Sequence, residues 1–231
     1  LLTREAWWWF DQLGDARSAW PLFGRALAPL AVVGLLCLPA ARRRWPLAAF
    51  AEAYRWASTA VAVTLWAWIF LVNAVSDGNA APLPYLPLAN PIDLATAGGL
   101  LALFAWFRLW HDRPDRTFPI DAVVAGTTFY WLNAVLLRTL HHWVGIPFRL
   151  EQMLQSTLVQ ACLSLLWTTL ALGAMLFATR RSLRPLWLVG GALLAVVVVK
   201  LFLVDLSRVG TVERIVSFIG VGLLLLVIGY F

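Results

Sequence analysis

Long apolar runs alternate with short polar connections along this chain of 231 residues. A helix needs about 20 mainly apolar residues to cross a bilayer core, and seven runs approach or exceed that length. They occupy residues 24–40, 54–75, 92–110, 120–140, 153–178, 186–206 and 214–231. Because the connections are short, successive helices are expected to be antiparallel neighbours. The pattern predicts an all-α fold, a polytopic transmembrane helix bundle over residues 24–231.

The composition indicates that the solvent of this bundle is lipid. Apolar residues make up 61% of the chain and charged residues 13%, whereas soluble domains have about 45–50% and 25%. A soluble fold of this size could not bury so much apolar surface. The net charge of +6 comes mainly from arginines that flank the apolar runs, such as Arg42–Arg44. Membrane lipids, and not nucleic acid, are therefore the expected partners.

The arginines also predict the orientation of the bundle. Four lie in 41–55, three in 108–116 and three in 179–184, whereas 76–91 has none. Cytoplasmic loops carry the excess of basic residues in multi-span proteins. This distribution places residue 1 outside the membrane and the carboxyl end in the cytoplasm.

The first 23 residues differ from the rest because aromatic and charged side chains are interleaved. Trp7, Trp8, Trp9 and Phe10 are followed directly by Asp11. Such a segment is typical of a helix lying in the headgroup layer, and it is equally consistent with a linker that follows an earlier span. Since the chain begins with Leu, we expect it to be a piece of a longer polypeptide.

Polar residues gather at the end of the fourth run. Arg138, His141 and His142 share one helical face at spacings of three and four, and Asn133 precedes them. Charged groups within spans are costly and mark either function or a buried pair. This face could bind an anionic group, relay protons, hold a metal or form an ordinary interfacial cap.

Two further polar groups border the later runs. Glu151, Gln155 and, less regularly, Ser156 and Gln160 would form a stripe at the entry to the fifth run, with Glu151 paired to Arg138 or Arg149. Lys200 can extend toward the membrane surface, so its burial need not follow. In the predicted topology the polar groups fall on one outer side, as a candidate pocket. Its members are Asn90, Asp93, Asn133, Arg138, His141, His142, Glu151, Gln155, Lys200, Asp205, Arg208, Glu213 and Arg214.

No sequence motif for known chemistry is present. The chain has no nucleophile elbow, zinc-binding H-E-x-x-H, phosphate-binding loop or dinucleotide fingerprint. Adjacent histidines point about 100° apart on a helix, which disfavours a shared metal. No cofactor or metal is expected, and catalytic residues are unknown. If the protein were a membrane-embedded transferase, Asp93 and Asp205 would be its candidate carboxylates.

Four segments resemble a large bacterial family of predicted membrane proteins, the domain-of-unknown-function 2339 family. They are PYLPLANPIDL (84–94), LLRTLHHWVGIP (136–147), SLLWTTLAL (164–172) and the tail 184–231, from RPLWLVGG to GLLLLVIGYF. The resemblance implies a carboxyl-terminal portion of a longer protein in the bacterial inner membrane. Other parts of that polypeptide, or other membrane subunits, would be its partners. The resemblance implies no activity or catalytic residues.

These observations leave three functional hypotheses. The first is transport, or handling of a lipid or envelope component, through an outward-facing polar pocket. The second is a non-catalytic scaffold or assembly protein that binds partners through residues 1–23 and through helix faces rich in small residues. The third is the membrane-embedded transferase.

Overall fold

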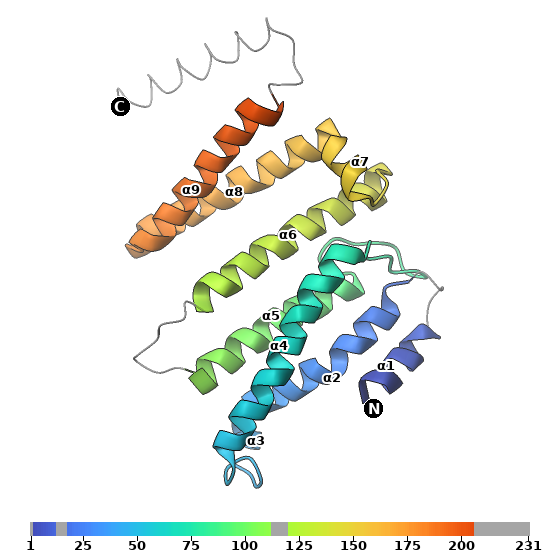
Figure 1. The fold of residues 1–231 in the computed structure, drawn as a ribbon, viewed down its shortest axis with the longest axis vertical. Helices are drawn as coiled ribbons and strands as arrows, with labels where there is room; N and C mark the ends of the chain where they lie inside the picture. Colours follow the sequence, from blue (N-terminus) through green and yellow to red (C-terminus); the bar gives the residue numbers. More distant parts are fainter. Residues whose placement is uncertain (1, 13–17, 112–119, 206–231) are drawn as a thin grey trace, which may run out of the picture. The chain divides into compact units, whose positions relative to one another are not determined.

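The computed structural model describes residues 2–12, 18–111 and 120–205, and these belong to two compact units, Leu1–Phe148 and Arg149–Phe231. Each unit is built from helices, and no strand occurs in the described ranges (Figure 1). The predicted all-α membrane bundle is therefore confirmed at the level of fold class.

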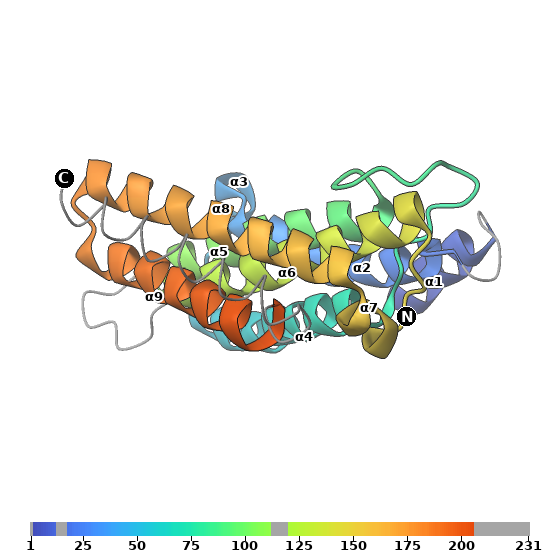
Figure 2. The same ribbon diagram turned by 90° about the horizontal axis from the view of Figure 1, so that it is seen from above.

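The described part of the first unit consists of long helices joined by shorter ones. Its elements are α1 (Leu2–Asp11), α2 (Trp20–Cys37), α3 (Pro39–Arg42), α4 (Ala51–Val75), α5 (Pro91–His111) and α6 (Ile120–Val144). Helix α2 packs against α1, α4 and α5, and α6 packs against α4 and α5 (Figures 1 and 2). Val33, Leu65 and Trp106 come from three of these helices and meet in the buried core.

The second unit is a helical hairpin with a short entry helix. It contains α7 (Leu150–Gln155), α8 (Thr157–Arg181), α9 (Arg184–Lys200) and a π-helical turn, η1 (Leu201–Asp205). Ser182 adopts a left-handed conformation (φ 54°) directly after α8, which ends the helix and lets α9 return along it. Gly190 of α9 lies against Met175 and the carbonyl of Ala171 on α8, so the two helices approach closely there.

Five helices of the described ranges are long and apolar enough to cross a membrane. Their spans are Trp20–Cys37, Ala51–Val75, Pro91–Leu109, Thr157–Arg181 and Arg184–Leu203. Helix α6 has 25 residues and covers the predicted run 120–140, but it is not among the five. The predicted run 214–231 lies outside the described residues, so a total of seven spans stays a prediction.

The first span begins four residues before the predicted run 24–40. Pro21 lies in the first turn of α2, where a proline costs no hydrogen bond and its fixed φ suits a helix. Pro29 is accommodated inside the helix. Pro39 follows the last residue of α2 by two positions, so prolines lie near both ends of this span.

The predicted fifth run, 153–178, is not one helix. Ser156 is extended (ψ 120°) between α7 and α8, and its hydroxyl accepts a hydrogen bond from the backbone N–H of Val159. A serine in this position caps a new helix and interrupts the old one. The polar stripe predicted from Glu151 to Gln160 is therefore divided. Glu151 and Gln155 share α7, whereas Gln160 lies on α8.

The aromatic amino-terminal segment forms α1, which packs on α2. Gly24 permits this contact, since a Cβ there would lie 2.7 Å from the carbonyl oxygen of Ala6. The guanidinium of Arg25 lies 5.5 Å from the ring centre of Trp7, and Trp8 and Trp9 are exposed. Helix α1 is thus attached to the bundle by one face and presents an aromatic face outward.

The close α8–α9 contact predicts opposite effects at two adjacent glycines. A Cβ at Gly190 would meet Met175 at 2.6 Å, whereas one at Gly191 has nothing within 4 Å. We expect Gly190→Ala to lower the free energy of unfolding by about 1–3 kcal/mol through overpacking. Gly191→Ala should leave it unchanged or raise it slightly, because alanine favours helix. Thermal unfolding of both variants in detergent measures the difference, and equal effects would contradict the packing.

Candidate functional site

A fully buried ion pair joins α5 and α6 at the end of the first unit that carries the 76–90 loop. Arg138 Nη1 lies 2.6 Å from Asp93 Oδ1, and neither side chain is exposed. Arg138 Nη2 donates to Asn73 Oδ1 of α4 at 2.8 Å, and Nε donates to the carbonyl oxygen of Ser76 at 3.1 Å. We call Asn73, Asn90, Asp93 and Arg138 the polar clamp, because they tie three helices and a loop together.

Asp93 is positioned by the start of α5. Its backbone N–H donates to Asn90 Oδ1 at 3.0 Å, which is a side-chain cap of the helix amino terminus. Its carboxylate accepts from the Asn90 amide, from the Leu88 N–H at 3.2 Å and from Trp131 Nε1 at 2.9 Å. A carboxylate with these donors and one guanidinium is neutralised and hydrogen-bonded, as a buried charge requires.

The loop closes tightly over the arginine. Gly78 has φ +73°, and a Cβ there would lie 2.9 Å from Arg138 Cδ, so this position needs glycine for its backbone and for its space. With Nε, Nη1 and Nη2 each bonded to an acceptor, the guanidinium is enclosed within the unit. An anionic ligand could reach Arg138 only if the Asp93 pair opened.

The two histidines contact the same loop. His142 Nε2 lies 2.9 Å from the carbonyl oxygen of Asp77, and its ring stacks on Tyr85 with centroids 4.2 Å apart. His141 Nδ1 lies 2.7 Å from the Ile146 carbonyl oxygen, and its Nε2 lies 3.9 Å from Asp77 Oδ2. Burial raises the pKa of the Tyr85 hydroxyl. No group of three metal-ligating side chains occurs among the described residues.

Local contacts are found for three further predicted residues, Asn133, Glu151 and Gln155. Asn133 donates to the Phe129 carbonyl oxygen of its own helix at 2.7 Å. In the second unit, Gln155 lies 3.5 Å from Glu151, so this pair is local to α7. Asp205 ends η1. Arg208, Glu213 and Arg214 lie outside the described residues.

Lys200 is anchored inside the second unit. Its Nζ donates to the Ser164 hydroxyl at 2.7 Å and to the Gln160 carbonyl oxygen at 3.0 Å, both on α8. The lysine therefore joins α9 to α8. Both bonds lie within the hairpin, which makes Lys200 a helix-pairing residue of this unit.

The first unit also contains an apolar cavity that sequence reasoning did not find. It has a volume of about 310 Å³ and lies between α4, α5 and α6. Its lining includes Val63 and Trp66 of α4, Trp106 and Phe107 of α5 and Thr127 of α6. We call it the α4–α6 cavity. It could not be predicted because it arises where three helix surfaces fail to fill the space between them.

The polar atoms in the cavity wall are already paired. Trp66 Nε1 donates to the Thr127 hydroxyl at 3.1 Å, and that hydroxyl donates to the Val123 carbonyl oxygen. Trp106 Nε1 donates to the Ser58 hydroxyl at 2.9 Å. The cavity therefore offers apolar surface and no unused donor from these two indoles, which suits a hydrocarbon better than a polar solute.

A family model described as a predicted membrane protein, DUF2339, matches residues 1–231, and the chain belongs to this family. The match includes the first 80 residues, where the sequence shows only the general character of the family. No curated protein and no solved structure matches the chain. The family description states that its members are predicted membrane proteins, and it names no activity. The activity must therefore be inferred from the site.

The polar clamp predicts strong coupling between Asp93 and Arg138. Either Asp93→Asn or Arg138→Gln alone leaves a buried charge without its counterion and should lower the free energy of unfolding by about 3–5 kcal/mol. The double variant removes both charges and should lose clearly less than the sum of the two. Thermal unfolding of the four proteins in detergent measures this cycle.

The exposed pair of Glu52 and Arg55 is the control. The same substitutions there, Glu52→Gln and Arg55→Gln, should each cost less than about 1 kcal/mol, because Glu52 is largely in solvent. Additive effects of Asp93→Asn and Arg138→Gln would show that the buried pair does not stabilise the unit as described.

Proposed function

We propose that this protein binds and handles a lipid, or an envelope component with a long apolar chain, in the bacterial inner membrane. The observation that carries the proposal is the α4–α6 cavity. Ligand pockets span roughly 300–1,000 Å³, so its volume of about 310 Å³ suits one apolar chain segment. A hydrophilic solute would lose its hydrogen bonds there without replacement.

The polar clamp supports the proposal of lipid handling. It gives the polar residues at the outward end a structural role, which is to hold helices together. With the orientation inferred from the arginine-rich connections, the 76–90 loop lies on the periplasmic side and the carboxyl end lies in the cytoplasm. The clamp then holds the periplasmic ends of α4, α5 and α6 together. Its part in the proposed function is to keep the helices that form the cavity in register.

The transferase hypothesis has lost one of its two candidate carboxylates. Asp93 is not exposed and is neutralised by Arg138, so it has no access to a substrate. The scaffold hypothesis keeps one supporting observation, the exposed face of α1 with Leu2, Trp8 and Trp9. A protein partner that copurifies in stoichiometric amount, and is released by Trp8→Ser with Trp9→Ser, would favour the scaffold role.

Filling the cavity should abolish chain binding. Val63 lines the cavity and is 57% exposed, so Val63→Trp places a large ring at an accessible edge without crowding the core. We expect this variant to retain less lipid than the wild type after purification in mild detergent. Native mass spectrometry of the two proteins measures the bound lipid.

Thr64→Trp is the matched control. Thr64 is the next residue of α4, it is exposed, and it does not line the cavity. A tryptophan there adds the same side chain at the same depth in the membrane, about 100° around the helix. If both variants, or neither, lost lipid, the cavity would not be the binding site and the proposal would fail.

A further inference from the structure

Two arginines lie at one end of the α4–α6 cavity. Thr59 of α4 and Phe107 of α5 line it, and Arg55 stands one helical turn before Thr59 while Arg108 directly follows Phe107. The Trp106–Ser58 hydrogen bond sets the register of the two helices at this level. Because α4 and α5 run in opposite directions, the steps from Ser58 to Arg55 and from Trp106 to Arg108 lead toward the same membrane face.

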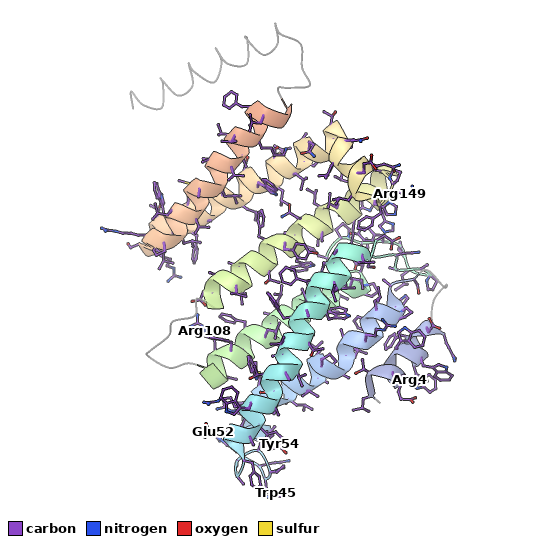
Figure 3. All side chains as sticks on the ribbon, in the orientation of Figure 1. Arg4, Trp45, Glu52, Tyr54, Arg108 and Arg149 are labelled. Atoms are coloured by element: carbon purple, nitrogen blue, oxygen red, sulfur yellow. The ribbon has the colours of Figure 1, made fainter. Side chains whose placement is uncertain are left out.

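A third helix confirms that face. Arg108 Nη2 lies 2.8 Å from Asp121 Oδ1, which belongs to the first turn of α6. Figure 3 shows Arg108, Glu52 and Tyr54 at the end of the first unit opposite the 76–90 loop. This end therefore carries the beginnings of α4 and α6 and the end of α5, and the polar clamp occupies the other end.

The depth of Arg55 matches that of lipid headgroups. Trp45 and Trp56 are both exposed, and Tyr54 lies near the start of α4, two residues before Trp56. Exposed tryptophan and tyrosine concentrate at the level of the headgroups in membrane proteins. Arg55 lies between Tyr54 and Trp56, and its guanidinium is 5.5 Å from the Trp56 ring centre. A phosphate group of the same leaflet would lie at this level.

Among the described residues each of these two guanidinium groups forms one ion pair, which leaves N–H donors that can bind an anion. Arg55 forms its ion pair with Glu52 at 3.2 Å and Arg108 with Asp121 at 2.8 Å, and each carboxylate partner is mostly exposed. Exposed pairs of this kind contribute little, and a guanidinium carries five N–H donors. The enclosed guanidinium of Arg138 is the contrasting case, with an acceptor on Nε, Nη1 and Nη2 and no exposure.

We infer that the occupant of the α4–α6 cavity is an anionic phospholipid from the leaflet at the arginine end. Its phosphate binds Arg55 and Arg108, and one acyl chain enters the cavity past Thr59 and Phe107. This inference rests on the proposed function. It adds the class of lipid and the end of the cavity at which the headgroup lies. Charge complementarity carries it, since arginine matches the geometry of phosphate and can bind it with two parallel hydrogen bonds.

The acidic residues at this end set the selectivity to be expected. Glu52 and Asp121 lie beside the two arginines, whereas Arg42, Arg43 and Arg44 add positive charge in the connection after α2. Arginines therefore outnumber these carboxylates at the arginine end. A zwitterionic lipid gains the same chain contact but less electrostatic attraction.

The test compares two lipids on the full chain. The protein is reconstituted in nanodiscs of equal parts phosphatidylglycerol and phosphatidylcholine, released in mild detergent, and examined for retained lipid by native mass spectrometry. We expect enrichment of phosphatidylglycerol in the wild type and a loss of that enrichment by about tenfold in the double variant Arg55→Gln with Arg108→Gln. Thermal unfolding checks that the double variant is folded.

The matched control is Arg43→Gln with Arg44→Gln. It removes the same charge from exposed positions on the same side of the unit, outside the cavity lining. Enrichment should persist in this control, and equal loss in both double variants would mean general surface attraction and overturn the inference. Salt screens that general attraction more strongly than a partly buried contact, so repeating the measurement at high salt should preserve the difference.

Val63→Trp separates this inference from the proposed function. If Val63→Trp removes bound lipid but the arginine variants keep the preference for phosphatidylglycerol, the chain site stands and the assignment of the headgroup is overturned. If Val63→Trp has no effect, the proposed function fails and this inference fails with it. Loss of retained phosphatidylglycerol in Val63→Trp and in the arginine double variant supports both.

Discussion

The ion pair between Arg138 and Asp93 is the interaction on which the first unit depends. Insertion of either charge into a membrane costs roughly 2.5–3.5 kcal/mol, so each is tolerated only with its partner. The pair is completed by Asn73 and by the Ser76 carbonyl, which draws α4 and the 76–90 loop into the same contact. One arginine thereby fixes the relative positions of three helices and a loop.

This constraint explains why the two ends of the first unit differ. At the clamp end the polar groups satisfy one another and leave no room, as the close approach of Gly78 to Arg138 shows. Toward the other end α4, α5 and α6 enclose a cavity with indole and aliphatic walls. In the function that we propose, the fixed end and the incompletely filled end together form a site for an apolar chain.

Much of the site could not be read from the chain because its partners are distant in sequence. Asp93 and Arg138 both stand out in the sequence as members of the candidate pocket, but the sequence suggests Glu151 or an anionic ligand as the partner of Arg138 and suggests no partner for Asp93. Their 45-residue separation gives no local signal of pairing. The break at Ser156 was missed for a different reason, since one hydroxyl cap decides it within an otherwise continuous run.

The sequence by itself determined the membrane environment, the helical class and the approximate ends of most of the described long helices, because long apolar runs have few alternatives in lipid. It also identified Asn90, Asp93 and Arg138 as residues that need an explanation. Tertiary structure alone decided that these three satisfy one another and that the open space lies elsewhere, between α4, α5 and α6. Pairing and cavities depend on which helix faces meet, and that depends on contacts between residues far apart in the chain.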